Sequence, residues 1–252
     1  MTSFRPLLVA IQFLTRIPVR LSAPASNAEL GRSVLWYPAV GLLVGLPGAS
    51  IAVWSIHAAH GRLVAAAMVV MVGALMSGGL HLDGLADSAD AWAGAGGDAE
   101  RALAIMKDPR CGPIGASALI LVLLAKFAAA ADLIAAGRAW PILFAPALAR
   151  AAIPILLATT PYVRRHGIGE RMAAFLPRRM APVGAIGLLA LCIVCDGAAA
   201  TLGTASAVAI SGWLLRRMMI NRIGGTTGDT TGALVELLET AAMVVAAFGG
   251  LQ

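Results

Sequence analysis

Long apolar stretches alternate with short polar segments along the whole chain, and this pattern predicts its architecture. Seven of these stretches approach or exceed the ~18–20 residues that a helix needs to cross a lipid bilayer. They cover residues 34–57, 62–80, 113–136, 139–160, 182–197, 198–215 and 233–250. Because a backbone in lipid must satisfy its own hydrogen bonds, each stretch is predicted to be an α-helix. The chain is therefore expected to be an all-α, polytopic integral membrane helix bundle, with residues 1–252 forming a single domain.

Two parts of this pattern are less clearly marked than the rest. Within 182–215, Gly197 and the small residues after it predict either a tight turn or a kink in one helix. The N-terminal stretch 6–19 is apolar but short, and Arg16 interrupts it, so it predicts an interfacial or re-entrant helix. The same stretch has features of a signal peptide, but Arg16 and Arg20 at its far end argue against cleavage.

Charge is scarce and unevenly distributed. Hydrophobic residues make up 59% of the chain and charged residues 13%, a composition that excludes an ordinary soluble globular domain. Fifteen of the 19 Lys and Arg residues lie in four segments that the spans place on one side of the membrane: 1–33, 81–112, 161–181 and 216–232. The opposite loops hold only Arg62 and Arg138. This asymmetry predicts that the four segments are cytoplasmic. It also explains the net charge of +6 through topology and anionic lipid, without nucleic acid.

Three carboxylates lie close together in the stretch 78–90, GGLHLDGLADSAD. On a helix, Asp83 and Asp87 are i,i+4 neighbours and Asp87 and Asp90 are i,i+3 neighbours, so all three share one face. Crowded carboxylates repel each other unless a cation lies between them, and oxygen ligands suit Mg²⁺ or Mn²⁺. The three are therefore candidate metal ligands, and a solvated acidic loop at the membrane boundary is the alternative. His81 is offset from this face and is expected to have a structural or supporting role.

A second polar cluster precedes the last apolar stretch, in the segment 224–232, GGTTGDTTG. Asp229 and Glu236 are seven residues apart and share a face on a continuous helix. A Gly/Thr run at a helix N-terminus offers backbone N–H groups that favour phosphate, which makes Thr227 a candidate substrate contact. The alternative is a simple capping turn, with Asp229 or Thr230 as the N-cap residue.

Carboxylates for a metal and basic groups for phosphate oxygens are together typical of phosphoryl transfer. Lys107 and Arg110 are candidate phosphate contacts in the segment after the aspartates, although each could also serve only as a topology determinant. Further basic candidates in the same four segments are Arg101, Arg164, Arg165, Arg216, Arg217 and Arg222. Lys126 and Arg150 differ because they lie within predicted spans, where a charge usually faces a polar cavity or an acidic partner. They are expected either to pair with the acidic clusters or to contact substrate phosphate.

These residues resemble a known family. The stretch 78–90 resembles the GG-hydrophobic-HLDGLADxxD motif of the cobalamin synthase family, adenosylcobinamide-GDP ribazoletransferase. Further similar segments are FLTRIPV at 13–19, YP at 37–38 with GLLVG at 41–45, IMKDPR at 105–110, LAKF at 124–127, and GTTGDTTGA at 225–233 with Glu236. Pro109 stands where the family commonly has a small residue such as Ser, and Ala91 follows the last aspartate where Gly is frequent. These departures concern local loop shape.

The resemblance implies a multi-pass enzyme of the bacterial inner membrane whose active site faces the cytoplasm. It would join adenosylcobinamide-GDP to α-ribazole or its 5′-phosphate, release GMP and require Mg²⁺. In this hypothesis Asp83, Asp87 and Asp90 hold the metal, and Asp229 or Glu236 binds a second metal or takes the proton of the attacking hydroxyl. A homo-oligomer, or a complex with other enzymes of nucleotide-loop assembly, is also an expectation.

Two other function classes compete with this hypothesis. A membrane phosphotransferase of the CDP-alcohol type uses similar helix-borne aspartates, but its motif has an Asp-Gly-x-x-Ala-Arg core, and here Leu85-Ala86-Asp87 follow Gly84, so the Arg is missing. A cation-coupled transporter would place its charges near the bilayer midplane, often in repeated halves. The acidic clusters here lie at the ends of predicted spans, and no repeat is visible.

Overall fold

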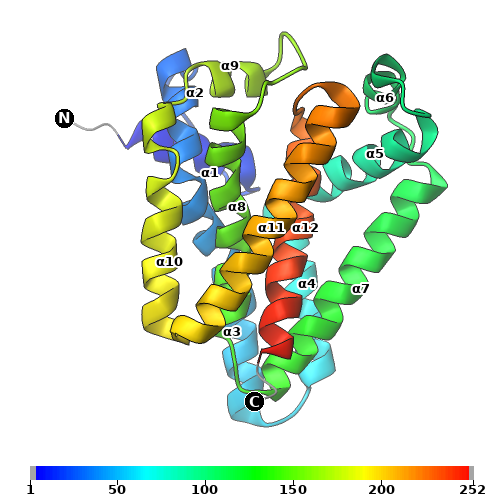
Figure 1. The fold of residues 1–252 in the computed structure, drawn as a ribbon. Helices are drawn as coiled ribbons and strands as arrows, with labels where there is room; N and C mark the ends of the chain where they lie inside the picture. Colours follow the sequence, from blue (N-terminus) through cyan, green and yellow to red (C-terminus); the bar gives the residue numbers. More distant parts are fainter. Residues whose placement is uncertain (1–3, 250–252) are drawn as a thin grey trace.

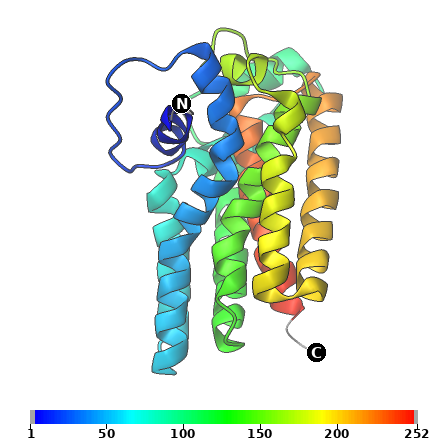
Figure 2. The same cartoon turned by 90° about the vertical axis from the view of Figure 1, so that its left-hand side faces the viewer.

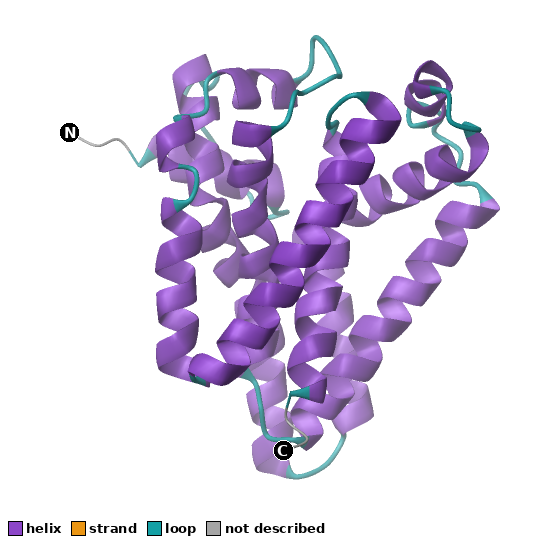
Figure 3. Cartoon of the chain, viewed as in Figure 1, coloured by secondary structure: helices purple, strands orange, loops and turns teal. Residues whose placement is uncertain are grey.

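The computed structural model describes residues 4–249, and these form a helical bundle (Figures 1 and 3). Within this range no strand occurs, and one isolated bridge joins Tyr162 to Thr226. In chain order the elements are α1 (Arg5–Leu14), α2 (Asn27–Ser33), η1 (Val34–Trp36), α3 (Tyr37–Ala58), α4 (Arg62–Ser77), α5 (Leu80–Gly94), α6 (Ala99–Ile105), α7 (Pro113–Ala135), α8 (Trp140–Thr159), α9 (Ile168–Ala174), η2 (Arg178–Met180), α10 (Val183–Asp196), α11 (Ala198–Ile223) and α12 (Gly228–Phe248).

Six helical segments are long and apolar enough to cross a membrane, which confirms a polytopic helical membrane protein. They are Asn27–Ala58, Pro113–Ala135, Trp140–Thr159, Arg178–Asp196, Ala198–Ile223 and Gly228–Phe248. The last of them starts earlier than the predicted 233, and the predicted end at 250 lies outside the described residues.

The predicted span 62–80 is instead a helix that breaks and turns. Helix α4 ends at Ser77, and α5 leaves it at an angle of 91°. Gly78 and Gly79 both adopt positive φ, 62° and 75°, a conformation that costs glycine little and that ends one helix before the next begins. The total of seven spans is reached only if α4 and α5 are counted as one broken span. Helix α5 therefore carries its aspartates across the end of the bundle.

Gly197 makes a tight turn and not a kink. It adopts a φ of +84° between α10 and α11, and α11 then runs back toward the upper end of the bundle at an angle to α10 (Figure 1). Helix α11 continues to Ile223, beyond the predicted end at 215, because Arg216 and Arg217 are compatible with a helix that leaves the lipid.

The four basic segments gather at one end of the bundle. In Figure 1 the upper end carries α2, α6, α9 and the turn between α11 and α12, whereas the links after α3, α7 and α10 lie at the lower end. Helix α1 has ten residues, too few to span, and it buries Val9, Ala10 and Leu14 against the upper part of the bundle (Figure 2). This agrees with the prediction that the N-terminal stretch does not cross the membrane.

Helix α8 lies at the centre of the bundle, in contact with α3, α10 and α12. Small residues along it, Ala145, Ala147, Ala149 and Ala151, are buried and let these neighbours approach closely. Arg150 lies among them with only 2% of its surface exposed, so the core of the bundle contains a charge. The partners of that charge connect the core to the candidate site.

Candidate active site

Helices α5 and α12 approach closely at Gly84, and this contact assembles the site. A Cβ atom on Gly84 would lie 2.6 Å from the Asp229 carbonyl oxygen, so the helices can approach this closely only because residue 84 is glycine. Because Gly84 follows Asp83 directly, the contact places Asp83 and Asp87 of α5 beside Asp229 in the first turn of α12. Carboxylates that are about 140 residues apart in sequence thus come together at the basic end of the bundle.

These carboxylates are close enough to repel one another. Partial burial, followed by the negative charges of Asp83 and Asp229, raises the pKa of the Asp87 carboxyl to about 6. Arg164 opposes this shift, and Asp90 adds to it. Helix α5 lies across the end of the bundle and outside the six spanning helices, so the Asp87 carboxyl lies near the polar surface. A cation bound here would favour the ionised form of each carboxyl.

Arg164 is the basic residue that the fold brings to these carboxylates. Its Nη2 atom lies 2.8 Å from Asp229 Oδ2 in a largely buried ion pair. The segment before it is held by the turn before α12, because Thr226 N–H donates to the Pro161 carbonyl at 2.8 Å and Val163 N–H donates to the Thr226 carbonyl at 2.9 Å. In the sequence Arg164 was one basic candidate among several, and only this long-range backbone pairing distinguishes it.

Asp90 has a different environment from the one predicted for a metal ligand. Its two carboxylate oxygens accept the Gly112 N–H at 2.7 Å and the Gly115 N–H at 2.8 Å. These donors belong to the first turn of α7, where a carboxylate is favoured by the unpaired N–H groups and by the helix dipole. Asp90 therefore fixes the end of α5 against α7, a role that the spacing of the aspartates could not reveal.

Among residues 4–249, no three His, Cys, Asp or Glu side chains form a ready-made metal cluster. The arrangement of three ligands on one face of α5 is thus not preassembled, because Asp90 is turned toward α7. The remaining donor set of Asp83, Asp87 and Asp229 is still oxygen-only and crowded with negative charge, which suits Mg²⁺ completed by water and phosphate oxygens. The assignment of metal ligands stays a prediction.

Thr227 is the N-cap residue of α12. Its hydroxyl accepts the Thr230 N–H at 3.2 Å, and the Thr230 hydroxyl accepts the Thr227 N–H at 2.9 Å. The predicted N-cap residues, Asp229 and Thr230, are wrong by two and three positions, since the helix begins before them. The Thr227 side chain is fully buried, so the structure assigns it a capping contact, and its predicted contact with substrate stays a prediction.

Lys126 and Glu236 form an ion pair inside the bundle. Lys126 Nζ lies 2.6 Å from Glu236 Oε2 and 2.8 Å from Glu239 Oε1, with all three side chains at most 13% exposed. Pairing with the acidic cluster before the C-terminus was one of the two explanations for Lys126, and the structure contains that pair. The cavity beside these groups measures about 30 Å³, about the volume of one water molecule in the liquid, and the predicted contact of Lys126 with substrate phosphate stays a prediction.

Arg150 connects three helices at the same depth. Its guanidinium donates to the Pro146 carbonyl at 3.0 Å and lies 3.3 Å from Glu239 Oε2. The Nη2 atom is also 3.2 Å from His81 Nδ1. Because arginine only donates, Nδ1 is the acceptor and carries no proton. His81 therefore has the structural role expected from its position, and it fastens the start of α5 to the core through Arg150.

Lys107 and Arg110 are exposed on the loop after α6. The Arg110 guanidinium makes two hydrogen bonds to Asp108, at 2.9 and 2.6 Å, and these bonds stabilise the ionised carboxylate, which lowers the pKa of Asp108 to about 2. The structure thus leaves both basic residues at the same end as the carboxylates, but no described contact joins them to the site. Their assignment to substrate binding stays a prediction.

With this geometry in place, the chain can be compared with known proteins. The family model described as cobalamin-5-phosphate synthase matches residues 6–247. The chain belongs to the cobalamin-5-phosphate synthase family. The match extends over all of the spanning helices, the aspartates of α5 and the start of α12.

Curated members of this family are similar to the chain over nearly its whole length. A protein of Ectopseudomonas mendocina is 48% identical over 95% of this chain and 97% of its own length. Proteins of Pseudomonas paraeruginosa and Pseudomonas aeruginosa are 49% and 47% identical, each over 97% of this chain and 98% of their own length. All three are named adenosylcobinamide-GDP ribazoletransferase. No solved structure matches the chain.

The contact between His81 and Arg150 can be tested with two substitutions. His81→Leu removes the acceptor and leaves a buried donor unpaired, so it is expected to lower the free energy of unfolding by about 1–3 kcal/mol. His81→Asn retains an acceptor near the position of Nδ1 and is expected to lose less. Thermal unfolding of both purified variants in detergent measures the difference, and equal losses would mean that the hydrogen bond contributes nothing.

The pairing of Lys126 with Glu236 predicts non-additive effects. Lys126→Met leaves buried carboxylates without a counter-charge and is expected to destabilise the protein by about 3–5 kcal/mol. The double variant Lys126→Met, Glu236→Gln removes one charge of each sign, so it should lose less than the sum of the single variants. Thermal unfolding of all three variants completes the cycle. A stable Lys126→Met protein with only a raised KM would instead assign Lys126 to substrate binding.

Proposed function

We infer that this protein is an adenosylcobinamide-GDP ribazoletransferase. It transfers the cobinamide phosphate moiety of adenosylcobinamide-GDP to a ribose hydroxyl of α-ribazole, or of α-ribazole 5′-phosphate, and releases GMP. The product is adenosylcobalamin or its 5′-phosphate. The observation that carries this inference is a carboxylate site of Asp83, Asp87 and Asp229 at the basic end of a bundle whose residues 6–247 match the family.

The reaction exchanges one phosphorus–oxygen bond for another. The ribose oxygen forms a bond to the phosphorus attached to the aminopropanol of cobinamide, and the bond from that phosphorus to the bridging oxygen breaks. GMP departs with the bridging oxygen, and the hydroxyl proton passes to a base. Since phosphoryl transfer leaves little covalent chemistry to the protein, its residues act by positioning and by stabilising charge.

Mg²⁺ is the cofactor that this donor set fits. When bound, it supplies positive charge that stabilises the pyrophosphate and the departing phosphate. Asp83 and Asp87 would hold it, with Asp229 as the neighbouring carboxylate and Asp90 holding α5 in place through α7. Arg164, with the exposed Lys107 and Arg110, would attract the phosphate groups to this end of the bundle.

Asp229 is the better of the two candidates for the base. It lies beside Asp83 in the first turn of α12, at the basic end of the bundle. Glu236 is two turns deeper, 5% exposed and paired with Lys126, so a proton transferred to it would have to enter the core. The CDP-alcohol phosphotransferase alternative is not favoured, since the family match covers nearly the whole chain.

The reaction and its site are tested together in purified protein reconstituted in lipid. Adenosylcobinamide-GDP, α-ribazole and Mg²⁺ are supplied, and cobalamin and GMP are measured by chromatography. EDTA should abolish the product, and Asp83→Ala should lower kcat by more than about a hundredfold, the effect of losing one electrostatic contact to the transition state. Asp132→Asn removes an exposed carboxylate near the far end of α7 and serves as the matched control.

An Asp83→Ala protein with normal turnover would overturn the metal assignment. Folded wild-type protein that forms no cobalamin, but joins a CDP-linked donor to an alcohol, would replace the proposed reaction by the lipid phosphotransferase reaction.

The site is proposed to face the cytoplasm from the bacterial inner membrane, as one copy or as part of an oligomer or a complex of nucleotide-loop enzymes. The gathering of basic segments at one end of the bundle supports this orientation, because such segments are retained on the cytoplasmic side.

This orientation predicts the reactivity of Cys111, which is exposed in the loop before α7. In a protein with Cys192 and Cys195 replaced by Ser, a membrane-impermeant maleimide should label Cys111 in inverted vesicles but not in intact spheroplasts. Ala136→Cys, made in a cysteine-free protein, places a thiol in the exposed loop at the opposite end and should give the reverse pattern. Labelling of Cys111 in spheroplasts would reverse the proposed orientation.

A further inference from the structure

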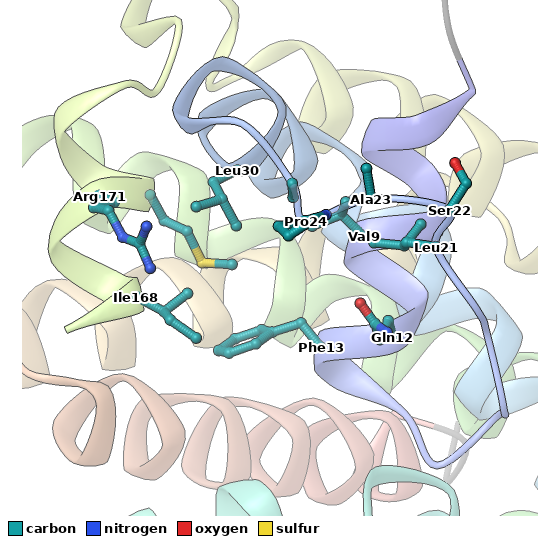
Figure 4. Close-up of a pocket in the computed structure, with 12 residues that line it drawn as sticks. Val9, Gln12, Phe13, Leu21, Ser22, Ala23, Pro24, Leu30, Ile168 and Arg171 are labelled. Atoms are coloured by element: carbon teal, nitrogen blue, oxygen red, sulfur yellow. The ribbon is translucent and has the colours of Figure 1, made fainter.

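A large pocket lies at the basic end of the bundle, apart from the carboxylates. It measures about 610 Å³ and is enclosed by α1, the segment 21–25, α2 and the start of α9 (Figure 4). In Figure 4 the Phe13 ring and Ile168 face each other at one end of the pocket, with Arg171 on the same helix as Ile168. The volume is in the range of small-molecule binding sites, which is roughly 300–1,000 Å³.

The walls of this pocket are held by specific contacts. Arg5 donates to the Ala23 carbonyl at 3.0 Å, and Gln12 donates to the Val19 carbonyl at 3.1 Å, so the connection after α1 is tied back to α1 itself. The Phe13 ring stacks on Tyr37 with centroids 6.4 Å apart and an angle of 15° between the planes. The pocket thus presents a supported aromatic face in the loop-rich end of the molecule.

The lining is mostly apolar, with two neutral polar side chains, Gln12 and Ser22, and one positive charge. Val9, Leu30 and Met172 provide apolar surface beside Phe13, and Arg171 provides the charge. Among the described residues, the Arg171 side chain has no hydrogen-bond or ion-pair partner, so its guanidinium is available to an anion. The lining contains no Asp or Glu. A carboxylate is the strongest acceptor for the N–H edge of a guanine base and is absent here, whereas the benzimidazole base of a nucleoside has no N–H edge to satisfy.

Residues that flank the pocket lining contact the carboxylate-bearing helices on two sides. After Phe13, the Arg16 N–H donates to the Met76 carbonyl at 2.8 Å, which places the end of α1 on the bend that leads into α5. On the other side, a Cβ atom on Gly169 would touch the hydroxyl of Tyr162, and the same hydroxyl lies 3.5 Å from the Cβ position of Gly228, next to Asp229. The walls of the pocket thus continue into segments that contact both helices that carry the carboxylates.

The other large pocket offers a different environment. It measures about 520 Å³ and is lined by residues of the spanning helices α8, α10, α11 and α12, such as Leu148, Leu189 and Val208. A mostly apolar pocket between spanning helices suits acyl chains better than a ribose phosphate, because polar groups buried there would need hydrogen-bond partners. The pocket beside α1 and α9 is the one at the end where a water-soluble nucleoside arrives.

We propose that the pocket between α1, α2 and α9 binds the acceptor nucleoside, with the benzimidazole base of α-ribazole on Phe13 and its 5′-phosphate, when present, on Arg171. The proposal rests on the proposed function and names the subsite for one of its two substrates. The ribose then lies between this pocket and Asp229, where its hydroxyl meets the activated phosphorus. Adenosylcobinamide-GDP occupies neither Phe13 nor Arg171.

Steady-state kinetics with each substrate varied in turn test the base contact. Phe13→Leu keeps apolar volume but removes the stacking face, and it should raise the KM for α-ribazole by about three- to tenfold. Ile168→Trp fills the pocket from the opposite wall and should raise the same KM. The KM for adenosylcobinamide-GDP should not change in either variant. Phe248→Ala, which removes an exposed ring near the opposite end of α12, is the control and should leave both KM values unchanged.

The phosphate contact is tested by comparing two acceptors. Arg171→Gln should raise the KM for α-ribazole 5′-phosphate by about tenfold or more, the effect of losing one charge-assisted contact, while the KM for α-ribazole changes little. Equal changes for both acceptors would overturn the assignment of Arg171. A raised KM for adenosylcobinamide-GDP with an unchanged KM for α-ribazole would assign the pocket to the other substrate.

These outcomes are separate from failure of the proposed function. If wild-type protein forms no cobalamin from the two substrates, the proposed reaction fails. If wild-type protein is active but Phe13→Leu and Ile168→Trp, folded as judged by their melting temperatures, keep the wild-type KM for α-ribazole, the reaction stands and the subsite is wrong.

Discussion

The ion-pair network inside the bundle is the contact on which the rest of the structure depends. Lys126 of α7, Glu236 and Glu239 of α12 and Arg150 of α8 balance their charges in a region where an unpaired charge would be strongly unfavourable. Each pair is made only when these three helices are correctly aligned. Because Arg150 also reaches His81, the network sets the position of α5 as well. Charges in the core thereby specify the arrangement of helices whose apolar surfaces alone would pack in several ways.

The polar residues deep in the bundle and those at its basic end have different roles. Deep in the bundle, acid and base groups are paired with each other beside a cavity of about 30 Å³. At the basic end, Asp83, Asp87 and Asp229 carry more negative charge than Arg164 balances, and that imbalance is what attracts a divalent cation. The same sequence motifs therefore contribute both to folding and to chemistry. His81 and Asp90 stabilise the fold, whereas Asp83 and Asp87 form part of the carboxylate site.

The break between α4 and α5 allows a membrane-spanning bundle to hold its carboxylates at the polar boundary. A straight continuation of α4 would carry the aspartates away from α12, whereas the 91° bend at Gly78 and Gly79 turns them across the end of the bundle. There they meet the N-terminus of α12 and the segment that precedes α9. Transfer of the corrinoid-linked phosphate from the nucleotide to the free nucleoside can then take place at the polar boundary, beside helices that remain in lipid.

Much of this architecture was determined by local sequence. Hydropathy and length predicted the all-α bundle and most of its spans, because lipid requires each apolar stretch to close its own hydrogen bonds. The asymmetry of Lys and Arg predicted which segments share one end, and the spacing of Asp83 and Asp87 placed them on one face of a helix. The motifs also predicted the family. All of these follow from interactions between residues near one another in the chain, or from the medium that surrounds it.

Tertiary structure decided what depends on contacts between distant segments. Asp90 accepts hydrogen bonds from the start of α7. The pairing of 161–163 with Thr226 brings Arg164, and not another of the basic candidates, to the carboxylates. The glutamate partners of Lys126 lie more than a hundred residues away in sequence, so its ion pairs were visible only once α7 and α12 were placed together. Spacing along a helix determines which face a residue occupies, but the partner on the opposite helix is set by packing.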